Sequence, residues 1–384
     1  MPYILDIATA VPDHAISNPQ VIDFYSRFLE QHNATALKEK LPLIVENSKI
    51  TNRYSCIPDF TGNGTELFHE PDYNPRVEDR LSLYAEHCLP LSVKAIDALL
   101  VKTLFLPSDI THIITVSCTG LMAPGLEFLI SEYYNLQHAE KSAINFLGCY
   151  AALKALNQAN HITKSEPTAC VLIVCTELCS LHFNASTNME DVIANLIFAD
   201  GAAALLVCGD NSPHITNKVV LHIDAMGSAY VPGTLDHMTW SVTSSAFRMF
   251  LSRKIAAAIK DNILSQTSRF LVEKRPHIDH WAIHPGGIRI IQAVQHGLLL
   301  SDKDVEDSLS ILQEYGNMSS PTILFILKKI FDRIKETSSG GNESIFSCAF
   351  GPGLNIEMMQ LSAVDTSSQI NKMLYKSNVV HSQI

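Results

Sequence analysis

The chain has 384 residues, of which 47% are hydrophobic and 17% charged, so it is long and apolar enough to bury two cores or one large double domain. Its 28 Lys and Arg against 39 Asp and Glu give a formal net charge of -11. That charge excludes the overall positive field that drives non-specific binding to nucleic acid or anionic membranes. Any anionic ligand must therefore be bound by a local group of basic residues.

Neither the N-terminal stretch nor any other segment has the pattern of a signal peptide or a membrane span. Residues 1–14 (MPYILDIATAVPDH) lack a basic region followed by a sustained apolar run, and no stretch approaches about 18 apolar residues. The nine cysteines are scattered, without the C-x2-C pairs of zinc sites or the density of a disulfide scaffold. We therefore expect a cytoplasmic protein without a metal site, whose cysteines lie mostly in the core.

Short apolar runs that alternate with segments of helical period predict an α/β architecture. Strands are predicted at residues 111–117 (THIITVS), 169–176 (ACVLIVCT), 202–208 (AAALLVC) and 280–283 (HWAI), and helices at 82–101, 125–134, 151–161 and 247–264. Pro90 marks a boundary or a kink in the first of these helices. Residues 58–79 are polar and rich in Gly, Pro and Asn, as a surface loop would be.

Two similar stretches indicate that the chain is an internal duplication. FADGAAALLVC and FGPGLNIEMMQL each run from a glycine-containing turn into an apolar strand. A polar segment, DNSPHITNK, follows the first of them and is typical of a boundary. The predicted parts are residues 1–214, residues 215–363, and a flexible tail at 364–384 where periodicity is lost.

Cys149 lies in NFLGCYAALK, between Gly148 and residues that favour a helix. The glycine permits a tight turn from strand to helix, and a thiol at a helix N-terminus is next to unpaired N–H groups that stabilise a thiolate. Cys149 is therefore a candidate nucleophile. The alternative is an inert cysteine packed in the core, and position alone does not decide between the two.

Two further residues could complete a Cys/His/Asn site. His284 follows the apolar strand in WAIHPGGIRII, at the end of a strand where ligand sites of α/β sheets lie. Asn317 lies in EYGNMSSPTI, in a turn before a helix predicted from Pro321. The alternatives are a solvated loop histidine and a capping asparagine. The order of the three resembles papain-like proteases, but Cys149 lies mid-chain, outside the sequence context of the protease cysteine.

Four motifs, LGCYAAL, WAIHPGGIRII, YGNMSSPT and FGPGL, resemble in their order and spacing the type III polyketide synthases, the chalcone synthase-like members of the thiolase superfamily. ITNRY, SCTGLMAPGLE and FADGAAA add to the match, which runs from residue 4 to residue 361. The resemblance implies an α/β thiolase fold of five layers, αβαβα, built from two duplicated halves. It also implies a homodimer and a bacterial-type member of the family.

The reaction that the resemblance implies is the iterative decarboxylative condensation of malonyl-CoA onto an acyl-CoA starter. Cys149 would hold the acyl group as a thioester, and His284 would keep Cys149 as a thiolate. His284 and Asn317 would donate hydrogen bonds to the enolate left by decarboxylation, as an oxyanion hole. Coenzyme A thioesters are then the substrates, with no other cofactor. The expected product is a pyrone, a resorcinol or a phloroglucinol.

Several other positions match the substrate cavity of the family. Phe198 and Met249 match its gatekeeper aromatics, although phenylalanines on either side of Met249 make that register ambiguous. His182 matches a position that is small in chalcone synthases, and Cys118 matches a position in the starter pocket. For Phe198 and Cys118 the alternative is ordinary core packing.

A loop and a basic pair complete the expected site. The loop that borders the cyclisation cavity matches Gly351, Pro352 and Gly353, but its first glycine is replaced by Ala349. Arg53 and Lys49 match basic residues that bind coenzyme A phosphates, with an exposed solvated pair as the alternative.

Two rival functions are weighed against this one. A β-ketoacyl-ACP synthase III-like enzyme shares the three residues but makes one condensation, and its histidine normally lies in His-Gln-Ala-Asn, whereas His284 is followed by PGG. A thiolase-fold binding protein without turnover would be expected to have lost one of the three residues.

Overall fold

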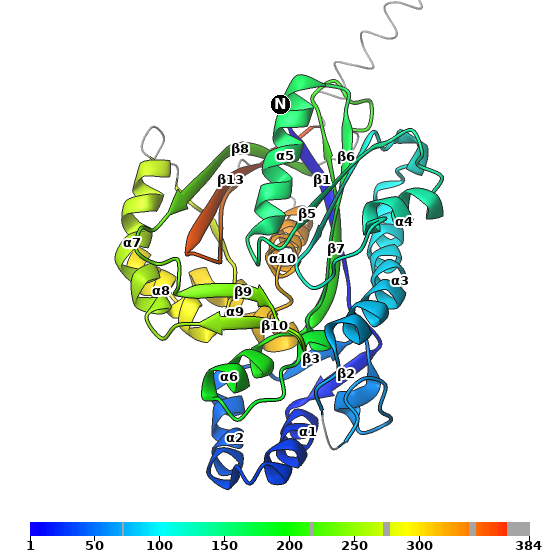
Figure 1. Ribbon diagram of the computed structural model, residues 1–384. Coiled ribbons are helices and arrows are strands. Elements are labelled where there is room, and N and C mark those ends of the chain that lie inside the picture. The colour runs from blue at the N-terminus through cyan, green and yellow to red at the C-terminus, as the bar shows by residue number, and fades with distance from the viewer. Residues whose placement is uncertain (71–72, 216–218, 272–276, 338–342, 367–384) are drawn as a thin grey trace, which may run out of the picture.

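The computed structural model describes residues 1–70, 73–215, 219–271, 277–337 and 343–366. A sheet of nine strands runs through the molecule in the order β11-β12-β13-β8-β1-β7-β6-β4-β5 (Figure 1). These strands are β1 (Tyr3–Ala10), β4 (His112–Ser117), β5 (Glu140–Asn145), β6 (Cys170–Leu178), β7 (Asp200–Cys208), β8 (Val219–Tyr230), β11 (His280–Ile283), β12 (Ser344–Gly351) and β13 (Asn355–Asp365).

The two halves of the chain repeat one strand pattern. In the N-terminal half β1 is antiparallel to β7, β7 is antiparallel to β6, and β6 is parallel to β4. In the C-terminal half β8, β13, β12 and β11 follow one another with the same directions. The halves join where Tyr3 and Ile4 of β1 pair with β8. The repeat confirms the predicted duplication.

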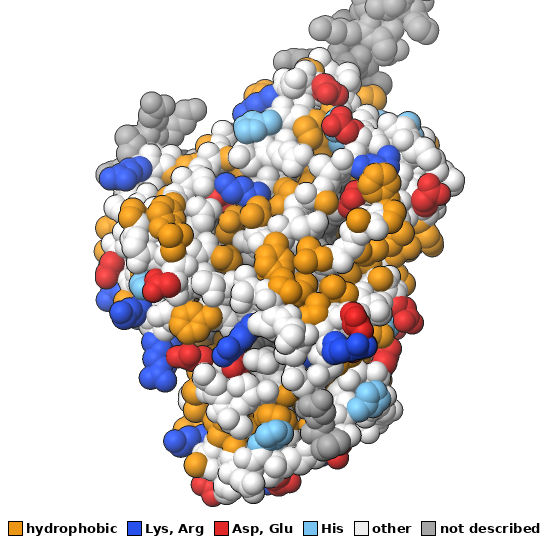
Figure 2. Space-filling model, in the orientation of Figure 1, with side chains coloured by type: hydrophobic (Ala, Val, Ile, Leu, Met, Phe, Trp, Pro, Cys, Tyr) orange, Lys and Arg blue, Asp and Glu red, His pale blue; other side chains and the backbone are white. Residues whose placement is uncertain are grey.

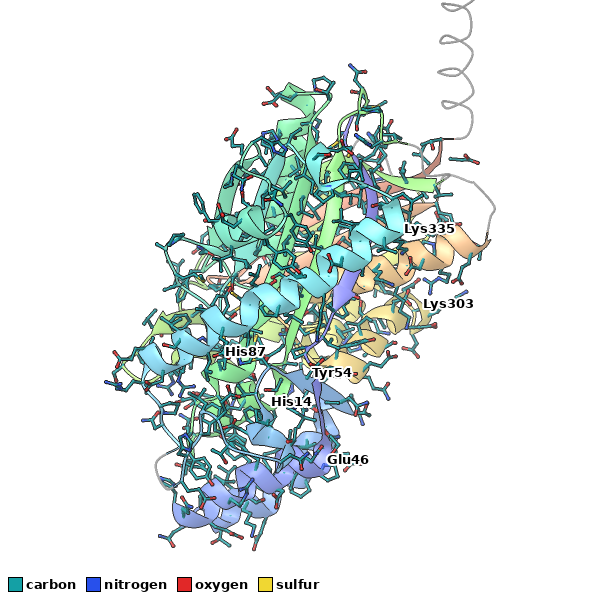
Figure 3. All side chains as sticks on the ribbon, turned by 90° about the vertical axis from the view of Figure 1, so that its right-hand side faces the viewer. His14, Glu46, Tyr54, His87, Lys303 and Lys335 are labelled. Carbon is teal, nitrogen blue, oxygen red and sulfur yellow. The ribbon has the colours of Figure 1, made fainter. Side chains whose placement is uncertain are left out.

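Helices cover the sheet in layers, and the buried clusters show which face each helix covers. Ile4, Ile173 and Ile345 belong to a cluster that also contains α5 (Ala151–Ser165) and α10 (Thr322–Thr337), so these two helices lie between the halves. The outer face of the N-terminal half packs on α3 (Val77–Thr103) and α4 (Leu126–Tyr133). The outer face of the C-terminal half packs on α7 (Ile255–Phe270), α8 (Ile288–Leu298) and α9 (Glu306–Tyr315). This order gives the expected five layers, and α3 is seen crossing the sheet in Figure 3.

The strands predicted from apolar runs are confirmed, with small shifts at their ends. Every residue of β6 and β7 is buried, because helices cover both faces of the sheet, and this is why the runs are apolar throughout. The helix predicted at 82–101 is part of α3, which continues through Pro90 rather than ending there.

The prediction of a helix at 247–264 was wrong for residues 247–254. Phe247–Leu251 form strand β10, which pairs with β9 (Met238–Val242), and α7 begins only at Ile255. The sequence FRMFL fits both the helical period and the alternation of a strand. It forms a strand, in which Phe247 is buried while Arg248 on the other face is exposed. Packing with β9 therefore decides a local ambiguity.

Six further elements form the lower part of the molecule as seen in Figure 1. They are β2 (His14–Ser17), α1 (Asn18–Gln31), α2 (Thr35–Ser48), β3 (Asn52–Ser55), the short helix η1 (Pro58–Thr61) and α6 (Met189–Ile197). The predicted loop at 58–79 is irregular apart from η1 and the start of α3, with residues 71–72 outside the described part. The tail predicted at 364–384 begins inside β13, which ends at Asp365. Its residues 367–384 lie outside the described part of the chain.

Neither a helix that could span a membrane nor a cluster of metal ligands is found among the described residues. None of the helices there combines the length and the apolar character that a bilayer span requires. No three His, Cys, Asp or Glu side chains in the same residues gather as ligands of one metal ion.

Candidate active site

Cys149 lies in a tight turn between β5 and α5. Gly148 has a φ of 85°, in the left-handed region, and α5 begins at Ala151. A Cβ atom on Gly148 would be 2.5 Å from Cδ of Pro352, so the Gly351-Pro352-Gly353 loop packs directly against this turn. The sequence placed Cys149 at a helix start, and the structure has it there, 6% exposed.

Asn317 lies in the corresponding turn before α10. Its backbone N–H donates to the carbonyl of Ile197 and its carbonyl accepts from Ala199 N–H, both at 2.9 Å, which fixes it beside Phe198. The side-chain oxygen of Asn317 accepts from the backbone N–H of Ser319 at 2.8 Å. The amide NH₂ group therefore points away from its own turn and can donate to another group.

His284 directly follows β11. Its backbone N–H donates to the carbonyl of Cys348 at 2.9 Å, which extends the pairing of β11 with β12. The side chain is 1% exposed, and neither ring nitrogen has a hydrogen-bond partner among the described residues. Burial lowers the pKa of His284 to about 3, so the imidazole is neutral and both nitrogens are available to a ligand.

The turn before α10 reaches the thiol of Cys149. Burial raises the pKa of Cys149 to about 12, and hydrogen bonds from the side chains of Ser319 and Asn317 act in the opposite direction. The negative charge of Glu177 adds to the increase. Burial therefore favours a neutral thiol here, while the hydroxyl and amide donors that would stabilise a thiolate already reach the sulfur.

Glu177 is a buried residue that the sequence analysis missed. It lies in β6, is 0% exposed, and accepts hydrogen bonds from Cys118 N–H (2.8 Å), the hydroxyl of Thr119 (2.7 Å) and the hydroxyl of Ser320 (2.6 Å). Burial raises its pKa. These bonds tie the segment after β4 to the turn before α10. A lone acid ending the apolar run ACVLIVCT was the signal that could have found it.

A cavity opens next to these turns. It reaches them through Gly148, Cys118 and Ser319 and extends toward α1 and α6. Its lining includes five of the residues predicted from the family match, namely Phe198, Cys118, His182, Met249 and Arg53. The other seven predicted site residues do not belong to its lining in the described part of the chain: Cys149, His284, Asn317, Lys49, Gly351, Pro352 and Gly353.

Aromatic rings fill the side of the cavity next to His182. The imidazole stacks on Phe247 with ring centroids 4.3 Å apart and 7° between the planes. Its Nε2 donates to the carbonyl of Thr119 at 2.7 Å, and its Nδ1 accepts from Phe247 N–H at 3.2 Å. Trp240, which the sequence analysis also missed, donates from Nε1 to the carbonyl of Cys118 at 2.9 Å. These contacts narrow the cavity on this side.

The two basic residues expected at coenzyme A lie in different surroundings. Lys49 ends α2 in a left-handed conformation and is exposed. Arg53 is 3% exposed and donates from Nη2 to the carbonyl of Leu196 at 3.0 Å, and burial lowers its pKa to about 10. Arg53 therefore belongs to the inside of the cavity, while Lys49 is on the surface.

Comparisons with known proteins agree with this geometry. Residues 2–211 match the N-terminal domain, and residues 222–365 the C-terminal domain, of chalcone and stilbene synthases. An alpha-pyrone synthesis polyketide synthase-like protein of Mycobacterium tuberculosis, Pks18, is 26% identical, over 92% of this chain and 89% of its own. The solved structure of PKS-I from the brown alga Ectocarpus siliculosus has a TM-score of 0.87 and 30% identity, and covers 94% of this chain and 98% of its own.

A second similar structure is the C-terminal type III polyketide synthase domain of Steely1 from Dictyostelium. It has a TM-score of 0.84 and 26% identity, and covers 94% of this chain and 99% of that domain. With the family models matched along both halves, the chain belongs to the chalcone and stilbene synthase family, and it is an acyltransferase of the type III polyketide synthase class.

Proposed function

We propose that Cys149, His284 and Asn317 carry out the iterative condensation of malonyl-CoA onto an acyl-CoA starter. The observation that supports this most is that the turn before α10, in the C-terminal half, reaches the thiol of Cys149 in the N-terminal half. Donors from the side chains of Asn317 and Ser319 reach Cys149, and the ring nitrogens of His284 are buried and without partners among the described residues.

The first step loads the starter. The neutral imidazole of His284 accepts the thiol proton, and the Cys149 sulfur attacks the thioester carbon of the acyl-CoA. Coenzyme A leaves as its thiolate and takes the proton from the imidazolium. The acyl-enzyme is uncharged at the sulfur, so the burial that opposes a thiolate no longer opposes the loaded state.

The second step extends the chain. The amide NH₂ of Asn317 and an N–H of His284 donate to the thioester oxygen of malonyl-CoA, which stabilises the enolate formed as carbon dioxide leaves. The enolate carbon attacks the Cys149 thioester and releases the sulfur. The product on coenzyme A then returns to Cys149 for another round. An amide suits this position better than an acid, because a fixed negative charge would repel the malonyl carboxylate.

Coenzyme A thioesters are the proposed substrates, with no further cofactor. Lys49 is exposed and is therefore available to bind coenzyme A phosphates at the surface. Arg53, which the sequence match assigned to the same phosphates, is buried in the cavity wall and suits that role less well.

We further propose that the protein is a cytoplasmic homodimer. β5 is the last strand of the sheet, and Leu121, Phe128 and Tyr133 near it are 43%, 50% and 57% exposed. Figure 2 shows hydrophobic side chains gathered across the part of the face that carries β5 and the segment before α4. An open strand edge beside exposed apolar side chains is the kind of surface that a second copy covers.

The proposed product is a small pyrone or a resorcinol or phloroglucinol ring. The mycobacterial relative has alpha-pyrone synthesis in its name. The stack of His182 on Phe247 and the ring of Trp240 leave little room on that side of the cavity, which favours a short chain or a slim one. The single-condensation alternative, a β-ketoacyl-ACP synthase III-like reaction, has no observation that favours it.

The test is to incubate the protein with malonyl-CoA and a panel of aromatic and fatty acyl-CoAs and to identify products by mass spectrometry. We expect cyclic polyketides from the wild type and none above background from Cys149→Ala. Cys175→Ala, which changes another buried cysteine, should leave the product unchanged. Full product formation by Cys149→Ala would refute the assignment of the nucleophile.

A further inference from the structure

Two cysteines outside the active site face each other across β6 and β7. Cys170 is the first residue of β6 and Cys208 the last residue of β7, and they are directly paired in the antiparallel register. Their sulfur atoms are 3.1 Å apart. Both are free thiols, 1% and 0% exposed.

The backbone pairing shows that this position suits a cross-strand disulfide. The N–H of Gly209 donates to the carbonyl of Ala169 at 3.0 Å, so residues 169 and 209 form a hydrogen-bonded pair. The next pair, Cys170 and Cys208, is therefore a non-hydrogen-bonded pair, where opposite Cα atoms lie about 4.5 Å apart and side chains are closest. That spacing is within the range of disulfides, so the bond can form without movement of the strands.

The surroundings distinguish the two thiols. The thiol of Cys208 donates to the sulfur of Cys170, and the hydroxyl of Ser212 lies 3.2 Å from the same sulfur. The hydrogen bond from Cys208 is the largest of the effects that lower the pKa of Cys170, against an opposing effect of burial. Cys170 is therefore the thiol that ionises first and reacts first with an oxidant.

Residues only two positions from each cysteine in the sequence are exposed, and the pair lies far from the proposed active site. Thr168, two residues before Cys170, is exposed, and so is the side chain of Asp210, by 40%. Opening of these strand ends exposes the sulfurs without unfolding the domain. Glu177 lies seven residues further along β6, which at the rise of a strand is about 23 Å away.

We propose that Cys170 and Cys208 form an oxidation site, in which a peroxide converts the two thiols into a disulfide that links β6 to β7. The Cys170 thiolate attacks the peroxide, its O–O bond breaks, and Cys170 becomes a sulfenic acid as one water is released. The Cys208 sulfur then attacks the Cys170 sulfur, the S–O bond breaks, and a second water leaves. The cysteines lose two electrons and two protons in total, and hydrogen peroxide is reduced to two waters.

The bond would act on stability and not on the reaction. It closes a loop across a sequence separation of 38 residues, which reduces the freedom of the unfolded chain. For a chain of this length we expect the melting temperature to rise by about 5 °C. The active site lies at the other end of the strands, so turnover should not change.

The experiment uses the full chain as Cys149→Ala, so that oxidation of the active-site thiol does not contribute. The protein is treated with hydrogen peroxide, the remaining thiols are alkylated, and peptides are mapped without reduction. We expect one linked pair of peptides that contain Cys170 and Cys208, a loss of two hydrogens, and the rise in melting temperature.

Two variants in the same background make the result specific. Cys170→Ser should abolish both the link and the rise, whereas Cys175→Ser, at a buried cysteine of the same strand, should keep both. Peptide maps without the Cys170–Cys208 link, at peroxide concentrations that oxidise other thiols, would overturn the proposal. An equal rise in the melting temperature of Cys170→Ser would overturn it as well. Because turnover is not measured, failure of the proposed reaction leaves this result unaffected.

Discussion

The turns before α5 and α10 hold equivalent places in the two halves, but the side chains proposed as catalytic, Cys149 and Asn317, are held in them by different means. The turn before α5 is set by close packing, because Gly148 has a positive φ and lies against Pro352. The turn before α10 is set by hydrogen bonds that bind the backbone and the side-chain oxygen of Asn317. The duplicated fold thus supplies two equivalent positions, one before each of the helices α5 and α10 that lie between the halves. The residue is a cysteine at the first position and an asparagine, with an amide donor, at the second.

The difference teaches what each half can tolerate. A change in the α10 turn removes a donor and leaves the fold supported by several other bonds. A change in the α5 turn moves the backbone itself, because no space is left beside Gly148. Two substitutions separate these effects.

The largest effect is expected for Asn317→Asp. The variant loses the amide donor and places a negative charge where the malonyl carboxylate must approach, so decarboxylation should fall by about 100- to 1000-fold. Release of carbon dioxide from malonyl-CoA measures this step alone. Acylation of Cys149 by a starter, followed by mass spectrometry, serves as the control and should fall much less. Equal losses in both steps would contradict the separate roles of the two turns.

Gly148→Ala tests the packed turn. The new methyl group meets Cδ of Pro352 and the backbone keeps a positive φ, so the free energy of unfolding should fall by about 3 kcal/mol, measured by chemical denaturation. Gly62→Ala is the matched control, because Gly62 has a φ of 78° but no atom within 4 Å of a new Cβ, and it should lose only about 1 kcal/mol. Equal losses would mean that the contact with Pro352 does not matter.

Two of the buried histidines, His182 in one half and His284 in the other, give the smallest expected effect. Burial lowers the pKa of each to about 3, so the unfolded chain binds protons that the folded chain does not. Their contribution to stability is complete above the unfolded pKa near 6.5 and is lost as the pH falls toward 3. Between pH 7 and pH 5 each histidine should reduce the free energy of unfolding by about 2 kcal/mol.

His182→Gln should remove one such contribution, so its stability should fall by about 2 kcal/mol less than that of the wild type over this range. The measurement is chemical denaturation at both pH values. His161→Gln, at an exposed position of α5, should follow the wild type. Parallel pH curves for His182→Gln and the wild type would show that His182 does not remain neutral in the folded protein.

Much of the fold could be predicted because its strands are buried on both faces. Runs such as ACVLIVCT need no alternation, and their length and β-branched residues identify them. FRMFL could not be assigned in the same way, because its period fits either element until β9 lies beside it. The candidate site shows the same limit, since Arg53 in ITNRY has the pattern of an exposed cation and is buried by α6 and the cavity wall.

The sequence alone determined the class of protein and singled out Cys149, His284 and Asn317 as the proposed catalytic residues, because each lies in a short motif whose turn residues are local. Only the tertiary structure decided the network of Glu177, the ring of Trp240 and the contact of Cys170 with Cys208. Those contacts join segments that are 38 to 143 residues apart. Local periodicity carries no information about residues that are so far apart in the sequence. The groups come together only when the strands and turns that carry them pack in the folded chain.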